Sequence, residues 1–236
     1  MSFLFSRCLR CRSLFLFLLG CIFCSGIFTT TVFAAPKSQF SQVINPGILG
    51  VDIVNGNLES VENPSVQMDP LPFSFACQTS TGTIGTSEEQ IYIQNPFGAN
   101  NGWTLTLSSE NPKKLWEGID SEGNSVRYDF NDPAGNGCDD GSDADAFGGQ
   151  LLVDPSSAHI ETGICKNCTT DHVSVGTLAS FEEGVTDTIT LLSGSAASDD
   201  VGDWVLQGIH LEQNIPAEQR ASENYAIDLT LSLQAI

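Results

Sequence analysis

The chain has 236 residues, of which 41% are hydrophobic and 16% are charged, and its formal net charge is −20. All 29 acidic residues but only six of the nine basic residues follow residue 34, so this part of the chain carries 6 minus 29, or −23. A charge of this sign and size repels nucleic acids and anionic lipids and therefore argues against both as partners.

The first 34 residues have the pattern of a secretory signal peptide. A positively charged start is followed by an almost wholly apolar stretch, Ser13 to Phe28, and by the small residues that a signal peptidase requires. The positive charges are Arg7, Arg10 and Arg12. We therefore predict a signal peptide over residues 1–34, with cleavage after Ala34, and a single domain over residues 35–236.

An alternative to this cleavage is lipidation. Residues 18–21 resemble a lipobox, which would leave a lipidated Cys21 at the membrane, although the apolar stretch continues past it to Phe28. No later apolar stretch is long enough to span a bilayer. We expect an exported protein, secreted or held at the cell surface, without a transmembrane anchor.

Apolar and polar residues alternate with a period of two in several short segments, which predicts strands with one buried face. In chain order these segments are residues 50–54, 73–78, 90–94, 103–107, 149–153, 186–192, 204–211 and 225–233. Turn clusters such as Asn55–Asn57 and Asn95–Gly98 separate them, and no helical period persists beyond one turn. The sequence therefore predicts an all-β fold, an antiparallel β-sandwich of immunoglobulin-like or Greek-key type.

Six aspartates lie between Asp129 and Asp145, and no lysine or arginine occurs from Tyr128 to Cys165. Carboxylates crowded in this way require full solvation, proton uptake or a bound hard cation, and oxygen ligands without histidine favour Ca²⁺. We predict a structural calcium site whose ligands come from Asp129, Asn131, Asp132, Asp139, Asp143 and Asp145. The alternative is a solvated loop in which the aspartates form Asx turns and caps.

Four cysteines follow the signal peptide: Cys77, Cys138, Cys165 and Cys168. In an oxidising compartment they are expected to form two disulfides, for which three pairings exist. We favour Cys77 with Cys138, which would tie the acidic loop to a strand, and Cys165 with Cys168, which is local. A redox-active Cys-x-x-Cys site and a four-cysteine zinc site are the alternatives, and nothing around Cys165 suggests the βαβ unit that the former would need.

Catalytic motifs are absent from the sequence, because its three histidines stand apart and no nucleophile motif accompanies them. We therefore expect no catalytic residues and no enzyme. Tryptophans offer a binding surface instead, since an exposed indole stacks on sugar rings. Trp116, which follows the basic pair Lys113 and Lys114, is the better candidate, whereas the alternation around Trp103 also fits a buried strand face.

Two motifs suggest a family. Residues 101–106, Asn-Gly-Trp-Thr-Leu-Thr, and the Ile215–Ala217 stretch before Tyr225 and the final alternating strand resemble WxL-type surface domains of Gram-positive bacteria, and more closely WxL-like secreted proteins of uncultured small-genome bacteria. The resemblance implies an exported β-sandwich that attaches non-covalently to the cell wall, with Trp103 and Leu105 as surface-binding residues. The second Trp-x-Leu of that family is missing from the last strand, where Leu229, Leu231 and Leu233 stand.

Together these features predict a secreted or surface-displayed, non-catalytic, calcium-stabilised protein that binds a cell-wall polymer or other surface proteins. Two alternatives remain open. One is a fibre or pilus-type subunit that self-assembles by adding its terminal strand to the sheet edge of a neighbour. The other is a secreted hydrolase, which would require a cleft with two facing carboxylates.

Overall fold

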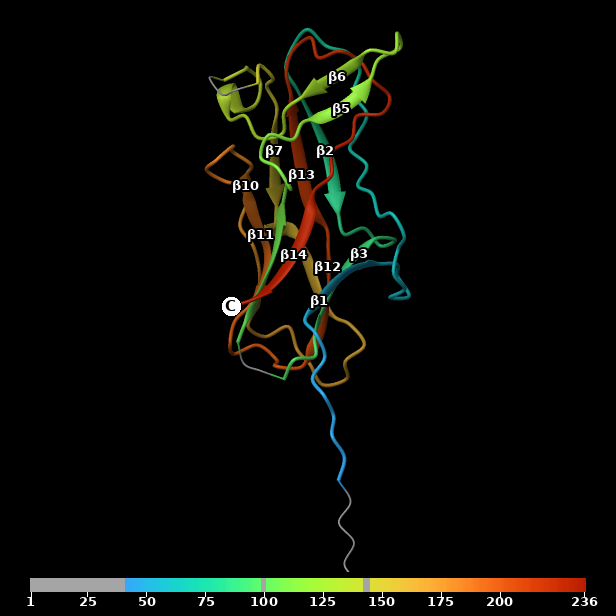
Figure 1. The fold of residues 1–236 in the computed structure, drawn as a ribbon, viewed down its shortest axis with the longest axis vertical. Coiled ribbons are helices and arrows are strands. Elements are labelled where there is room, and N and C mark those ends of the chain that lie inside the picture. Colours follow the sequence, from blue (N-terminus) through green and yellow to red (C-terminus); the bar gives the residue numbers. More distant parts are fainter. Residues whose placement is uncertain (1–40, 99–100, 142–144) are drawn as a thin grey trace, which may run out of the picture. The chain divides into compact units, whose positions relative to one another are not determined.

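The computed structural model describes residues 41–98, 101–141 and 145–236 (Figure 1). The chain divides into two compact units, Met1–Ile44 and Asn45–Ile236. Of the first unit only residues 41–44 are described, and they are exposed and without regular structure. The predicted signal peptide, its cleavage site and the alternative lipidation site at Cys21 lie outside the described residues.

The second unit consists of short strands. Their bounds are β1 Gly50–Val54, β2 Gln78–Ile84, β3 Gln90–Asn95, β4 Trp103–Ser108, β5 Trp116–Ile119, β6 Ser125–Tyr128, β7 Gln150–Asp154, β8 His159–Thr162, β9 Val173–Val175, β10 Ala179–Ser180, β11 Thr188–Gly194, β12 Gly202–Gln207, β13 Ile209–Ile215 and β14 Thr230–Ala235. Two 3-10 turns, η1 Ala134–Asn136 and η2 Pro155–Ser157, are the described helical segments. The predicted all-β class is therefore confirmed.

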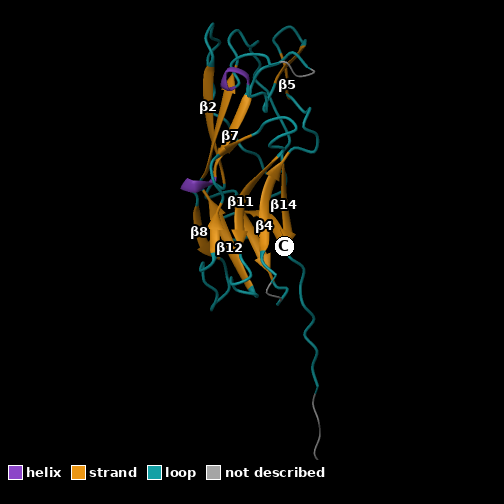
Figure 2. Ribbon diagram, turned by 90° about the vertical axis from the view of Figure 1, so that its left-hand side faces the viewer, coloured by secondary structure: helices purple, strands orange, loops and turns teal. Residues whose placement is uncertain are grey.

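The strands form three four-stranded sheets and one hairpin, and every pairing is antiparallel. Sheet A has the order β1-β3-β12-β8, sheet B has the order β10-β7-β13-β2, and sheet C has the order β14-β4-β11-β9. Strands β5 and β6 pair with each other. Figure 2 shows β4, β11 and β14 in one layer, opposite a layer that contains β2, β7, β8 and β12.

Sheets A and B are joined end to end through one central strand. β12 and β13 are separated only by Gly208; β12 pairs with β3 and β8, and β13 pairs with β2 and β7. Gly208 has a positive φ of 79° and donates its N–H to the carbonyl of Gly85 at 2.9 Å. The continuous strand predicted over residues 204–211 is therefore wrong at this point, because a residue with positive φ breaks the pleat.

The core fills the space between sheet C and sheets A and B. The indoles of Trp103 on β4 and Trp204 on β12 face each other with ring centroids 5.2 Å apart, and both side chains are fully buried. Aliphatic residues from all three sheets belong to the same core cluster. These include Ile91, Ile93, Leu105, Leu107, Leu151, Val153, Leu191, Leu206, Ile209 and Leu211. The predicted antiparallel sandwich is thus confirmed by a main core shared between facing sheets.

Two predicted strands have wrong bounds. Residues 73–77 are irregular, and the strand in this region is β2, which begins at Gln78. Phe73 and Phe75 are 53% and 79% exposed and contact each other edge to face. Neither side chain is buried against a sheet, so burial does not stabilise a strand here. The terminal strand begins at Thr230 rather than at Tyr225, because the preceding residues pair only at one bridge, Ala226 with Glu117.

The two core tryptophans allow a matched test of one buried hydrogen bond. The indole N–H of Trp204 donates to the carbonyl of Thr169 at 2.8 Å, whereas that of Trp103 has no partner among the described residues. We expect Trp204→Phe to lower the free energy of unfolding by about 1–2 kcal/mol more than Trp103→Phe, because only the former leaves an acceptor unpaired. Urea unfolding of both variants measures the difference. A larger loss in Trp103→Phe would contradict this account.

Candidate functional site: the acidic loop and an apolar groove

The acidic loop, residues 129–145, connects β6 to β7. Its base is tied to the strand side by backbone bonds from Asp129 N–H to the carbonyl of Gly148 and from Asp132 N–H to that of Gly149, both 2.9 Å. Three of the predicted ligands lie at this base, where Asp129, Asn131 and Asp132 are only 1–2% exposed. Because three polar side chains are buried so close together, their oxygens need hydrogen-bond donors or a cation as partners.

Asp132 acts as a backbone clamp for the loop. Its Oδ1 accepts the N–H of Ala134 at 2.8 Å and its Oδ2 accepts the N–H of Gly141 at 2.6 Å. The carboxylate thus joins residues nine apart in sequence through charge-assisted hydrogen bonds. This is the capping role that short polar side chains have in turns, and it leaves only the remaining lone pairs for a cation.

Asp129 and Asn131 are the other buried members. Asp129 Oδ1 accepts the N–H groups of Phe130 at 2.6 Å and of Asn131 at 3.4 Å. Asn131 Nδ2 donates to the carbonyl of Pro112 at 2.7 Å, while its Oδ1 is buried and accepts no hydrogen bond from the described residues. An amide oxygen in that position suits a bound cation or an ordered water.

The remaining predicted ligands are not gathered around this base. Asp139 is exposed, Asp145 is half-buried and accepts the N–H of Phe147 at 2.8 Å, and Asp143 lies outside the described residues. Across residues 41–98, 101–141 and 145–236, no three carboxylates of the loop bring oxygens within 4.8 Å of one another. Calcium binding therefore stays a prediction, supported at the base of the loop by Asn131.

The loop base also requires a glycine. Gly149 has a φ of 139°, and a Cβ at this position would stand 2.0 Å from the carbonyl oxygen of Asp129. Gly123 has a φ of 86°, and its Cβ would meet nothing within 4 Å. The two positions therefore separate the cost of close contact from the cost of the backbone conformation.

We expect Gly149→Ala to destabilise the protein clearly more than Gly123→Ala, for which the positive φ alone costs about 1–2 kcal/mol. The added loss arises because two backbone segments must separate and break the bonds at the base of the loop. Thermal and urea unfolding measure both values. Equal losses would mean that the loop base tolerates the extra methyl group.

Both favoured disulfides are present. Cys77 and Cys138 are joined with a Cα–Cα distance of 5.5 Å, and Cys165 and Cys168 with one of 5.8 Å. The first covalently links the residue before β2 to the acidic loop, as the sequence predicted. The alternative four-cysteine zinc site is wrong, because the sulfurs belong to two separate bonds and a disulfide sulfur is not a thiolate ligand.

The Cys165–Cys168 disulfide rests on a buried carboxylate. Asp203 accepts the N–H of Ile164 at 2.8 Å on Oδ2 and the N–H of Cys165 at 2.9 Å on Oδ1, and Tyr92 donates its hydroxyl to Oδ2. The pKa of Tyr92 is raised, first by burial and then by this hydrogen bond. Asp203 thus shapes the turn that carries the disulfide.

The two disulfides are expected to differ in reducibility. They join residues 61 and three apart, so the chain-entropy model gives about 2.5 kcal/mol less stabilisation for the short one, or roughly 50 mV in a two-electron potential. We expect Cys165–Cys168 to open first as glutathione becomes more reducing. Alkylation of free thiols followed by peptide mass spectrometry gives the order. Earlier opening of Cys77–Cys138 would contradict the loop-length account.

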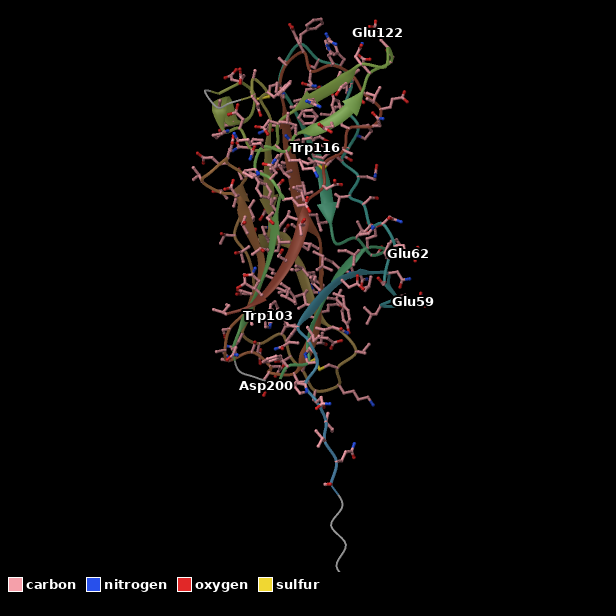
Figure 3. All side chains as sticks on the ribbon, in the orientation of Figure 1. Glu59, Glu62, Trp103, Trp116, Glu122 and Asp200 are labelled. Carbon is pink, nitrogen blue, oxygen red and sulfur yellow. A yellow bond between two sulfur atoms is a disulfide. The ribbon has the colours of Figure 1, made fainter. Side chains whose placement is uncertain are left out.

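Two of the three predicted surface-binding residues are not at the surface. Trp103 and Leu105 are 1% and 0% exposed, because β4 lies between β11 and β14 and its alternate residues face the core. Their assignment as surface-binding residues is therefore wrong. Figure 3 shows Trp103 and Trp116 far apart, and Trp116 is the first residue of β5 in the β5–β6 hairpin.

Trp116 is half-buried and held by neighbours. Its indole N–H donates to Gln213 Oε1 at 3.0 Å, and its ring stacks on that of Tyr128 with centroids 5.7 Å apart. Tyr128 in turn contacts Tyr225 edge to face. Burial raises the pKa of Tyr128 above its ordinary value, so its phenol stays neutral at physiological pH.

Trp116 lines an apolar groove that the sequence did not reveal. The groove has a volume of about 390 Å³ and lies between residues 64–68 and residues 225–231. Leu107, Leu151 and Leu211 of the core lie at its bottom, and its walls include Val66, Met68, Ile227 and Leu229. The groove therefore opens the hydrophobic core between the two layers to a ligand.

The groove has little acid–base chemistry. Its two carboxylates, Glu89 and Asp228, both serve local contacts: Glu89 accepts the N–H of Ser65 at 3.1 Å, and Asp228 pairs with Lys114 at 2.9 Å. The pKa of Tyr225 is raised mainly by burial, which leaves it a neutral hydrogen-bonding group. Such a lining favours binding of an apolar group over catalysis.

In comparisons with known proteins, no family model, no curated protein and no solved structure matches this chain. The described residues contain no helix long and apolar enough to cross a membrane.

Proposed function

We propose that this protein is an exported, non-catalytic binding protein, secreted or displayed at the cell surface, whose apolar groove engages a component of the cell envelope or another surface protein. The groove carries the proposal. Its bottom consists of core leucines, its walls are aliphatic and aromatic, and its two carboxylates are used in local contacts.

An apolar opening of this kind has a physical cost. Side chains that line a groove lack partner atoms on one side and forgo the dispersion contacts and burial that a closed core provides. In a small sandwich this cost is typical of a site that gains those contacts from a ligand. The groove is therefore better explained as a binding surface than as a packing defect.

Two further features support an exported protein. Both disulfides suit an oxidising compartment, and the signal-peptide pattern of residues 1–34 supplies a route to it. The strong negative charge keeps the surface soluble and disfavours nucleic acid. The motif resemblance to WxL-type domains agrees with a role at the cell wall, although its Trp103 and Leu105 are buried and do not provide the contact.

The hydrolase alternative gains no support from the groove, because Glu89 accepts the N–H of Ser65 and Asp228 pairs with Lys114. The fibre-type alternative assigned assembly to the terminal strand, whereas the exposed apolar segment lies before β1 and offers a different route to self-association.

The groove is tested by placing a charge on its rim. Val66 lines it and is 40% exposed, so Val66→Asp should fold normally; Val185, 73% exposed and outside the groove, provides the matched control Val185→Asp. We expect Val66→Asp to weaken retention on a purified envelope fraction of the producing cells by about tenfold or more, because the carboxylate would lose its water on binding. Equal retention of both variants would count against the groove.

We also propose a calcium ion in the acidic loop, with Asn131 Oδ1 and the neighbouring carboxylates as ligands. The support is the buried amide oxygen of Asn131 beside Asp129, in a loop without basic residues. The ion would neutralise the crowded carboxylates and reduce the freedom of the loop.

Thermal unfolding with calcium, with chelator and with magnesium tests this site. Calcium at a hundred times its Kd should stabilise the protein by about 2.7 kcal/mol, and the gain should disappear in Asp129→Asn, which removes the carboxylate charge beside Asn131. Asp171→Asn, an exposed aspartate outside the loop, is the control that should keep the gain. If calcium has no effect on the unmodified protein, the calcium site is ruled out and the alternative holds, in which the aspartates form solvated turns and caps.

A further inference from the structure

We propose that the groove binds the N-terminal arm, residues 43–48, of a second copy of this chain. This inference rests on the groove function proposed above and names its occupant. It makes the protein a self-assembling surface component whose copies are joined by addition of an extended segment to the sandwich of a neighbour.

The arm carries unusually exposed apolar residues. Val43, Ile44 and Ile48 are 81%, 86% and 86% exposed, and the segment has no regular structure before β1. Three large aliphatic side chains in so short an exposed segment gain free energy by burial, at roughly 25 cal/mol per Å². Such a segment is typical of a strand that completes its contacts in a partner.

The groove provides contacts of the matching kind. Its walls and bottom offer aliphatic and aromatic side chains, and its volume of about 390 Å³ leaves room for several aliphatic side chains. Both walls also have backbone available. Among the described residues, Ile227 to Leu229 form no backbone hydrogen bond, and Met68 pairs with β2 only at its bridge to Gly82. An extended arm between the two walls would therefore gain hydrogen bonds as well as burial.

The geometry of β1 favours a second copy over the chain's own arm. The arm leads into Gly50, which pairs with Gln94, and Gly47 donates its N–H to the carbonyl of Pro96 at 3.2 Å. The groove touches β1 at Ile53, which pairs with Ile91 at the other end of the same ladder. Residues 47 to 50 are thus held at the end of the ladder away from Ile53, whereas the arm of another molecule meets no such constraint.

Charge also matches. Residues 41–49, Ser-Gln-Val-Ile-Asn-Pro-Gly-Ile-Leu, contain no ionisable side chain, in a chain whose net charge is −20. Binding of the arm therefore brings no charged side chain into the groove. Electrostatic repulsion acts only between the negatively charged remainders of the two molecules. Because salt screens this repulsion over about 8–10 Å at physiological ionic strength, self-association should strengthen as salt is added.

The decisive experiment uses the full chain with the photo-crosslinking residue p-benzoylphenylalanine in place of Ile44. Equal amounts of isotope-labelled and unlabelled protein are mixed and irradiated, and cross-linked peptides are identified by mass spectrometry. We expect links of mixed isotope composition from position 44 to residues 64–68 or 225–231. Links confined to one molecule, or to surfaces outside the groove, would overturn the proposal.

Sedimentation velocity supplies a second measurement that does not depend on the probe. Ile44→Asp/Ile48→Asp and Val66→Asp should each weaken self-association by about tenfold or more, while Val185→Asp should not. A synthetic peptide of residues 41–49 should compete with association of the unmodified protein. A protein that stays monomeric at all concentrations and salt levels overturns the proposal whatever the variants show.

The outcomes also separate this inference from the groove function itself. If Val66→Asp loses envelope retention while the arm variants behave like the unmodified protein, the groove binds an envelope component and the arm is not its occupant. If purified peptidoglycan displaces the cross-link, both ligands use the groove, and the arm proposal stands. If neither retention nor association responds to Val66→Asp, both proposals fail.

Discussion

The contact between Trp103 and Trp204 holds the two layers of this sandwich together. Each indole is buried on a central strand, β4 in one layer and β12 in the other, so the strands that pair with these two are held by the same contact. β12 continues into β13 after Gly208. These two consecutive strands therefore extend from the end of the core that contains the tryptophans to the end that contains the groove. The groove lies where the layer opposite β13 is no longer a complete sheet: β4 ends at Ser108 and β14 begins only at Thr230.

Much of the fold could be predicted because it follows from local alternation. Strands such as β1, β3 and β4 have one apolar face, and turn residues mark their ends, so their positions follow from the sequence. Other features depend on partners distant in sequence. The strands β8 to β10 are two to four residues long, too short for a period to be recognised, and they form because neighbouring strands offer hydrogen bonds. Gly208 looks like an ordinary residue of an apolar run until its pairing with Gly85 is known.

The candidate sites show the same division. The disulfides and the crowding of acids at residues 129–145 depend on residue type and spacing, which the sequence displays directly. Which aspartates are buried depends on backbone pairing between residues 129–132 and 148–150, which the sequence does not display. The groove could not be predicted from the sequence, because it is lined by residues 64–68 and residues 225–231, which are far apart in the chain. Trp103 shows the opposite error, because a motif resemblance suggested exposure at a position where strand alternation correctly indicated the core.

The Cys77–Cys138 bond has a consequence for how the two sites relate. One wall of the groove, residues 64–68, belongs to the same stretch of chain that ends at Cys77, and Cys138 belongs to the acidic loop. The bond therefore links the loop covalently to the segment that leads to the groove wall. Thermodynamic reciprocity then applies: if a cation in the loop changes the affinity of the groove by some factor, an occupant of the groove changes the affinity for the cation by the same factor. If both proposed sites exist, this factor sets how strongly the divalent-ion content of the surroundings alters the affinity of the groove for its occupant.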